Sequence, residues 1–189
     1  MPALAQAAIP ATGVLAGCPG SLSQPFTPWL DFSSYGLAPG GGFETGATGW
    51  TLAGGAGVVV GNEPWHVTAS SDAHALSLPS GAIATTPSIC VATLYPTLRL
   101  FERNVRAGIG GLNVDVLYTS PLDGRQQQAR VLTLGGGSSA WAPTLPAAFL
   151  VNLTAGLHGS GTAQVRFRFT AVGGAVAIDD LYIDPYKAG

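Results

Sequence analysis

Apolar and polar residues alternate with a period of two along several short segments, the pattern of a half-buried β-strand. The alternation is clearest at residues 165–170, where Val165 and Phe167 alternate with Arg166 and Arg168, and it recurs at 112–118. Further short apolar segments, punctuated by glycine and proline, lie at residues 50–52, 57–60, 75–78, 88–93, 97–103 and 128–134. This many short strands predicts an all-β fold, an antiparallel β-sandwich of the jelly-roll type.

The connections fit the same fold. Asp123-Gly124 lies between two alternating segments and predicts a β-hairpin turn. One exception is residues 146–157, which read as a short helical turn ended by Gly156. The sequence therefore predicts at most one short helix.

The last predicted strand changes parity. Val176 and Ile178 would face one side of a sheet, whereas Leu181 and Ile183 have the opposite parity. A β-bulge at Asp179-Asp180 would reconcile the two halves and redirect a carboxylate. The alternative is a strand buried on both faces, which needs no bulge.

Composition narrows the class of partner. The 189 residues suit one domain, and only 10% of them are charged, against about 25% in an ordinary soluble domain. Eight basic and ten acidic residues give a net charge of −2 without a basic stripe, which argues against nucleic acid as a partner. We also expect no integral membrane segment. A surface this poor in charge suits association with itself or with a neutral polymer.

The chain divides into three parts by composition. Residues 1–17 are apolar and small and form an N-terminal arm or a signal-peptide remnant; Ala5-Gln6-Ala7 resembles a signal-peptidase site, and residues 15–18 resemble a lipobox. Residues 18–42 are rich in proline, serine and glycine and form an ordered, irregular lead-in anchored by four rings. These rings are Phe26, Trp29, Phe32 and Tyr35. Residues 43–187 form the sandwich domain.

The two cysteines, Cys18 and Cys90, favour one disulfide and therefore an extracellular or cell-surface location. Two other readings stay open. Both could be buried thiols of a cytosolic protein, or Cys18 could carry lipid if the lipobox is real. No Cys-x-x-Cys or Cys/His cluster exists, which argues against zinc.

Two short motifs carry a resemblance to a known family. Residues 42–50 (GFETGATGW) resemble the opening motif, and residues 177–183 (AIDDLYI) the closing strand, of secreted bacterial jelly rolls with the galactose-binding-like fold, which include many carbohydrate-binding modules. Residues 61–65 and the cysteine pair also resemble uncharacterised actinobacterial secreted proteins. The resemblance implies a structural Ca²⁺ held by Glu44 and Asp180, with Asp179 as a possible substitute and main-chain carbonyls assisting. The competing interpretation is that these carboxylates cap turns through hydrogen bonds.

Candidate ligand-binding residues are aromatic, because sugar rings stack on Trp and Tyr. They are Trp65 with His66, Trp141, and Tyr118 beside Gln126–Gln128. Trp65 lies in a polar loop and is the best candidate for an exposed ring, whereas Trp50 is expected to be a packing residue of the core or a strand edge, and the same interpretation competes with ligand binding for Trp141. The three histidines stand in no nucleophile-elbow context, and acids are few, so we predict no catalytic activity.

Two functions follow from these features. The first is a non-catalytic extracellular module that recognises a cell-surface or matrix glycan. The alternative is a self-assembling subunit of an extracellular filament or surface layer, in which the N-terminal arm contacts identical subunits.

Overall fold

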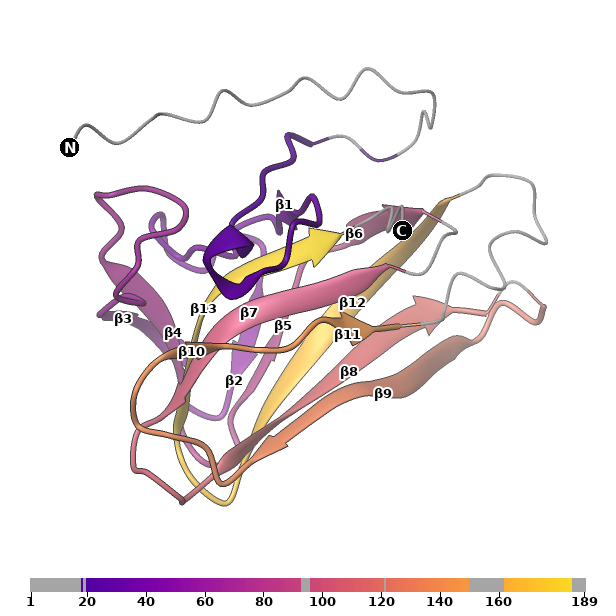
Figure 1. The fold of residues 1–189 in the computed structure, drawn as a ribbon. Coiled ribbons are helices and arrows are strands. Elements are labelled where there is room, and N and C mark those ends of the chain that lie inside the picture. The colour runs from indigo at the N-terminus through magenta and orange to yellow at the C-terminus, as the bar shows by residue number, and fades with distance from the viewer. Residues whose placement is uncertain (1–17, 19, 93–95, 121, 150–161, 185–189) are drawn as a thin grey trace.

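The computed structural model describes residues 18, 20–92, 96–120, 122–149 and 162–184. Their strands form two antiparallel sheets that pack face to face (Figure 1). The predicted all-β sandwich is therefore confirmed. Within the part of the chain that the structure describes, no helix is long and apolar enough to cross a membrane.

The first sheet has seven strands, with β13 (Val176–Asp184) near its middle. On one side of β13 lie β4 (His74–Leu78) and the edge strand β3 (Gly57–Val60). On the other side lies β7 (Thr97–Asn104), which also pairs with two short strands, β10 (Ala142–Pro143) and β11 (Ala147–Ala148). The seventh strand, β1 (Gly36–Leu37), pairs with the end of β13 and brings the lead-in into this sheet.

The second sheet has six strands around β12 (Thr162–Val172). One edge of β12 pairs with β8 (Gly111–Thr119), which forms a hairpin with β9 (Gln126–Gly135), as the Asp123-Gly124 turn predicted. The other edge pairs with β5 (Ile83–Thr85) and β6 (Ile89–Ala92), and β2 (Thr51–Ala53) extends the sheet beyond β5.

The main core fills the space between the sheets. From β12 it receives Val165, Phe167 and Phe169, and from β8 Leu112, Val114 and Val116, all fully buried. Trp50 lies 5.1 Å from Phe43 and 5.7 Å from Phe169 (ring centroids), so its predicted packing role is confirmed. The period-two pattern of the sequence thus describes the inner faces of both sheets correctly.

Strand β13 combines the two alternatives that the sequence left open. Its pairing with β7 shifts between Asp179 and Tyr182, and Asp180 has a φ of 47°, so the predicted bulge is present. Nevertheless, all nine residues of β13 are buried. The strand is buried on both faces because the lead-in and the loop at residues 61–68 cover the outer one.

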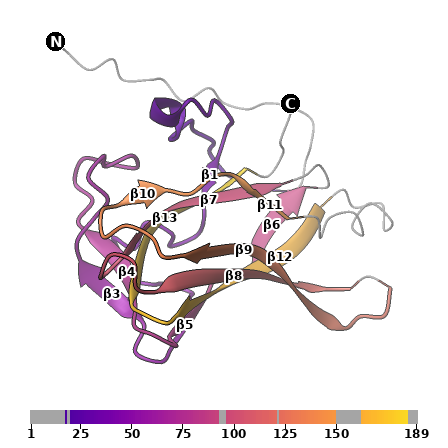
Figure 2. The same ribbon diagram turned by 60° about the horizontal axis from the view of Figure 1, so that its bottom comes forward.

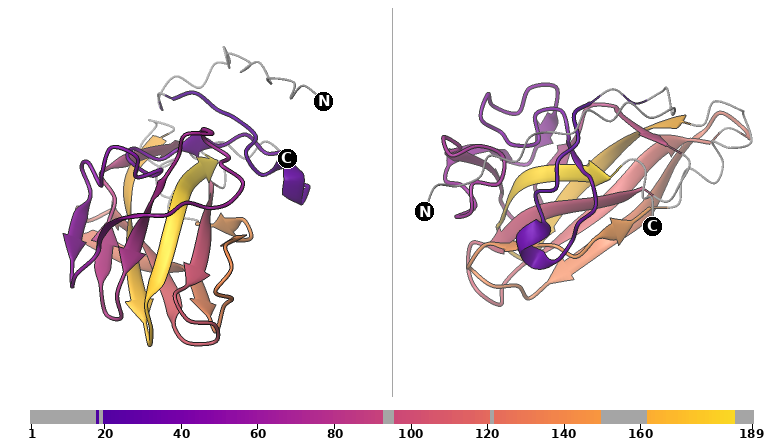
Figure 3. Two further views of the ribbon diagram at one scale, coloured as in Figure 1. Left: turned by 90° about the vertical axis from the view of Figure 1, so that its left-hand side faces the viewer. Right: turned by 45° about the horizontal axis from the view of Figure 1, so that its top comes forward.

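The lead-in packs on the outer face of the first sheet (Figure 2). It carries a short 3₁₀ turn, η1 (Thr27–Trp29), which crosses in front of β7 and β13 (Figure 3). Phe26 stacks on Phe101 at 5.6 Å and meets Tyr182 edge-on at 5.6 Å, which makes a second, smaller core. Phe32, however, is 62% exposed, so the prediction that it anchors the segment is wrong.

A buried arginine fixes the lead-in. The Arg99 guanidinium lies 4.0 Å from the Phe26 ring centroid, donates to Asp31 Oδ2 at 2.7 Å and donates to the Thr144 carbonyl at 2.8 Å. Asp31 also accepts a 2.7 Å bond from the Tyr35 hydroxyl. Burial raises the pKa of Asp31, but these hydrogen bonds outweigh it and hold the pKa below the ordinary value.

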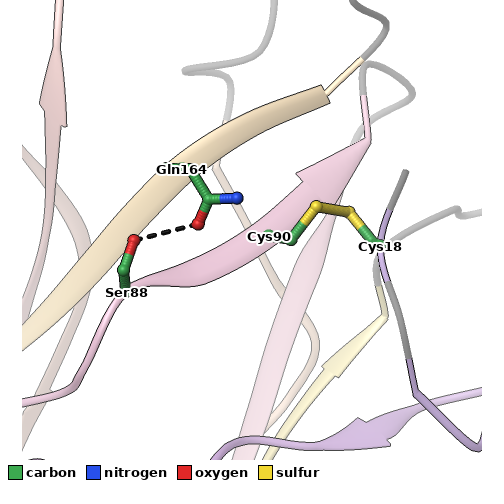
Figure 4. The surroundings of a disulfide bond; sticks show 4 residues. All are labelled: Cys18, Ser88, Cys90 and Gln164. Carbon is green, nitrogen blue, oxygen red and sulfur yellow. Dashed lines mark hydrogen bonds between the residues drawn. A yellow bond between two sulfur atoms is a disulfide. The ribbon is translucent and has the colours of Figure 1, made fainter.

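A disulfide joins Cys18 to Cys90 on β6, as the cysteine count predicted (Figure 4). The neighbouring Ser88 hydroxyl donates to Gln164 Oε1 on β12 at 2.9 Å. Because β6 belongs to the second sheet and the lead-in lies on the first, the disulfide ties the lead-in to both layers.

Two further predictions concern segments at the limits of the described chain. Residues 147–148 form β11, so the predicted helical turn is wrong at its start; residues 150–161 lie outside the described residues. The arm of residues 1–17, on which the filament alternative depends, also lies outside them.

Candidate functional site

Trp65 is an exposed aromatic ring on a rigid support. It is 45% exposed, its ring lies edge-on to Trp29 at 5.0 Å, and it lies at 34° to Phe101 at 5.5 Å. Beside it, His66 Nδ1 lies 3.3 Å from Asn62 Nδ2. This combination offers a flat apolar surface bordered by an imidazole and a carboxamide.

The loop that presents Trp65 is organised by the buried carboxylate of Glu63. Glu63 accepts hydrogen bonds from the backbone N–H groups of Trp65 and Val67, the latter at 2.7 Å. These bonds close a tight turn in which His66 has a φ of 49°. A fully buried acid therefore sets the position of an exposed ring.

The same loop is attached to the bulge of β13. Asp179 Oδ2 accepts a bond from the Glu63 N–H at 3.1 Å, and Asp180 Oδ1 accepts one from the Thr68 hydroxyl at 2.9 Å. Thr68 also bonds to the Tyr182 hydroxyl at 2.7 Å. The bulge thus turns two carboxyl groups towards the loop that carries Trp65. The parity change of the strand predicted the bulge but not this contact with the loop.

Among the described residues, no basic side chain forms an ion pair with either of these carboxyl groups. Burial raises the pKa of Asp179 to about 8, and the charge of Asp180 adds to the increase. Burial likewise raises the pKa of Asp180 to about 7, opposed by the Thr68 hydrogen bond and assisted by nearby acids, Glu63 foremost. Asp180 Oδ2 is buried and has no hydrogen-bond partner in the part of the chain that the structure describes.

The three predicted calcium ligands differ in what they could offer an ion. Both oxygens of Asp179 accept hydrogen bonds from backbone N–H groups: Oδ1 from that of Asp180 at 2.9 Å, and Oδ2 from that of Glu63. Glu44 receives the backbone N–H groups of Ala73 and His74 and contacts His74 Nδ1 at 3.1 Å. Only Asp180 has an oxygen without a partner. Among the described residues, no group of three or more His, Cys, Asp or Glu side chains is arranged to hold a metal.

The four predicted ligand-binding residues do not form one site. Trp141 is half-buried against the second core, and the Arg103 guanidinium lies 5.2 Å from its ring centroid. Both Trp141 and Trp65 therefore contact side chains of β7. Tyr118 instead packs against the main core from β8 in the other sheet. The structure therefore places Trp65, His66 and Trp141 on the outer side of the first sheet and separates Tyr118 from them.

Sequence reasoning missed several participants of this surface. Glu63 and Thr68 were missed, because their hydrogen bonds to residues more than 100 positions away have no local sequence pattern. Elsewhere in the lead-in, Phe32 and Leu30 are 62% and 81% exposed, although the segment was predicted to be anchored by its rings. Of these, only Glu63 could have been flagged, as one of ten acids placed next to the exposed tryptophan.

Comparison with known proteins supports the fold. No protein-family model matches the sequence, and no curated protein matches it. Among solved structures, the chain is similar to the CBM22-1 xylan-binding domain of Paenibacillus barcinonensis Xyn10C, with 18% identity, 78% of this chain and 93% of that chain covered, and a TM-score of 0.53. It is also similar to the CBM22-1–CBM22-2 tandem of the same protein (15%, 92% and 47%, TM-score 0.55) and to the CBM22-1–GH10 modules of Clostridium thermocellum Xyn10B (12%, 75% and 27%, TM-score 0.54). This chain shares the β-sandwich fold of those carbohydrate-binding modules.

Proposed function

We propose that this protein is a non-catalytic, extracellular glycan-binding module, and that Trp65 is the centre of its binding surface. The observation that carries the proposal is the exposed Trp65 ring held edge-on to Trp29 and beside the polar groups of His66 and Asn62. An exposed ring with fixed geometry stacks on a sugar at little cost in conformational entropy. The fold it shares with xylan-binding domains and the disulfide support this function and location.

The proposal assigns the acids a structural role. Glu63, Asp179 and Asp180 are each at most 1% exposed, so a polysaccharide on the surface would not reach them. They instead hold the loop beneath Trp65. Because these acids are not accessible at the surface, we expect the protein to bind a glycan without hydrolysing it.

Binding is tested by affinity electrophoresis and fluorescence titration against xylan, galactan and a wider glycan array. We expect at least one glycan to bind and the Trp65→Ala variant to lose about tenfold in affinity, which is roughly 1.4 kcal/mol. Leu122→Ala is the control, because Leu122 is an exposed apolar residue (78%) in the β8–β9 turn, away from Trp65. Unchanged affinity in Trp65→Ala, or no binding to any glycan, would overturn the proposal.

We also propose that Asp180 is the carboxylate to which Ca²⁺ binds, with main-chain oxygens and water as the other ligands. The partnerless, buried Oδ2 supports this choice, since calcium prefers carboxylate and carbonyl oxygen. Saturating calcium would then stabilise the folded state by about 2.7 kcal/mol at a hundredfold excess over the dissociation constant. Thermal unfolding in calcium and in EDTA measures the gain.

Two variants identify the site. Asp180→Asn should abolish the calcium-dependent gain, whereas Asp123→Asn, which changes a half-exposed aspartate of the β8–β9 turn, should keep it. The same melting temperature in calcium and EDTA would refute the calcium proposal. It would leave the glycan proposal standing, because the two rest on different residues.

A further inference from the structure

The outer face of the second sheet is open and polar. By register, the side chains opposite the core ones point outward from β12, β8 and β9. The polar ones are Gln164, Arg166, Arg168 and Thr170 on β12, Asn113, Asp115 and Thr119 on β8, and Thr133, Arg130, Gln128 and Gln126 on β9. Leu117 and Val172 are the apolar side chains among the outward positions of these three strands; Leu117 is half-buried, and Val172, at the end of β12, is exposed. We call this surface the arginine face.

A bulge in β9 builds the arginine face. Asn113 pairs with Thr133, but Asp115 pairs with Arg130, so the register shifts by one residue at Val131. Without this extra residue, Val131 and Ala129 would point outward and Arg130 and Gln128 would point into the core. The bulge therefore exchanges two apolar side chains for a guanidinium and a carboxamide on the surface.

The face already binds one carboxylate of its own. Asp115 is 4% exposed and accepts hydrogen bonds from Arg130 Nε and from Gln128 Nε2, the latter at 3.0 Å. Gln128 in turn accepts a 3.1 Å bond from Arg168. This arrangement demonstrates how guanidinium and carboxamide groups on adjacent strands receive a carboxylate here.

Positive charge remains after that pairing. Arg130, Arg166 and Arg168 face outward and Asp115 is the one acid on the three strands, so the face carries an excess of two positive charges in a chain of net charge −2. Arg166 is exposed and forms no ion pair with another described residue. No other acid on β8, β9 or β12 remains to neutralise this excess, because Asp115 already pairs with Arg130.

We propose that the arginine face binds an acidic polysaccharide, with uronate carboxylates on Arg166 and Arg168 and hydroxyl groups on the neighbouring Gln, Asn and Thr side chains. Guanidinium groups pair with carboxylates bidentately, and successive outward residues on a strand lie about 7 Å apart. Single-stranded nucleic acid suits the face less well, because the outward side chains on these strands include no ring on which bases could stack. This surface lies on the other sheet from Trp65 and does not depend on the function proposed above.

The test compares two probes that differ only in charge. Polygalacturonate carries a carboxylate on each sugar, whereas its fully methyl-esterified form has the same backbone without charge. In affinity electrophoresis, we expect the protein to bind the first and not the second, and binding to weaken as salt is raised. Equal binding of the two forms would overturn the proposal, as would the absence of binding to polygalacturonate.

Variants then locate the surface. The double variant Arg166→Gln/Arg168→Gln should lose at least tenfold in affinity for polygalacturonate. Arg125→Gln is the control, because Arg125 is an exposed arginine in the β8–β9 turn, off the face. Asp115→Asn should increase affinity, because it releases Arg130 from its internal partner. Wild-type affinity in the double variant would refute the assignment.

Two further measurements separate this proposal from its rivals. Trp65→Ala should bind polygalacturonate as tightly as the wild type, so that failure at one surface is distinguishable from failure at the other. Tighter binding to a single-stranded oligothymidylate than to polygalacturonate would assign the face to nucleic acid and refute the proposal. Circular dichroism and the melting temperature confirm that each variant is folded.

Discussion

Strands β12 and β13 are consecutive in the sequence, yet they are buried in different ways. β12 alternates strictly, with apolar residues in the core and arginines in water, whereas every residue of β13 is buried. The difference comes from the lead-in and the Trp65 loop, which together cover the outer face of β13 and leave that of β12 open. One outer face can therefore hold buried acids and support a loop, while the other presents charge to solvent.

Removal of Arg99 should have the largest effect on this difference in burial between the two strands. Arg99→Ala would leave Asp31 and the Thr144 carbonyl without their donor in a buried site. Loss of one partner of a buried ion pair costs roughly 3–5 kcal/mol. Urea denaturation should show this loss, and hydrogen exchange should show the outer face of β13 becoming accessible. Arg125→Ala, which removes an exposed pair with Asp123, should change stability by less than about 0.5 kcal/mol.

Removal of the disulfide should also weaken the attachment of the lead-in to the outer face of β13. The bond joins residues 72 positions apart, and loss of a closed loop of this size costs about 4 kcal/mol in the chain-entropy description. We expect the Cys18→Ser/Cys90→Ser variant to unfold at correspondingly lower urea concentration. A midpoint equal to that of the oxidised wild type would mean that Arg99 and Phe26 hold the lead-in by themselves.

The buried acids make a prediction about pH for the protein in EDTA. The pKa of Asp180 is raised to about 7 from 3.8, so the folded state binds this proton more tightly than the unfolded state. Stability is therefore greatest below pH 4 for this group and falls as the pH rises through 7. Between pH 5 and 8 the loss due to Asp180 should be about 3 kcal/mol. Asp180→Asn should remove this part of the decline and leave the part due to Asp179, whose pKa burial raises to about 8, and a wild-type profile that rises over this range would contradict the burial described here.

The smallest effect is expected on the open face. Arg166→Gln should change the free energy of unfolding by less than about 0.5 kcal/mol, because Arg166 is exposed and forms no ion pair with the described residues. The measurement is again urea denaturation. A loss above 1 kcal/mol would show that the arginines of β12 stabilise the fold and are not free for a ligand.

Local pattern predicted what depends on neighbours along the chain. The alternation at 165–170, the Asp-Gly hairpin and the parity change at Asp179-Asp180 each correspond to a feature of the fold. The exposure of Trp65 and the disulfide also agree with prediction. The bulge at Val131 was missed, because Val131 and Leu132 are both apolar and leave the change of parity ambiguous.

Contacts between distant segments could not be predicted. Nothing in residues 18–42 specifies that Arg99 will lie under Phe26, or that Phe32 will face solvent while Tyr35 is buried. Similarly, Glu44 looked like a metal ligand by its motif, but its carboxylate caps the start of β4. The resemblance located the acids, and only the packing of the loop at 61–68 distinguished their roles.

The disulfide also determines the route by which tension would travel through the molecule. A pull on the chain before Cys18 would pass directly into β6 and from there across its hydrogen bonds to β12. The covalent path of that force would bypass residues 19–89, which include the lead-in and the Trp65 loop. A module tethered through its N-terminus would thus keep its aromatic surface off the covalent path of a mechanical load.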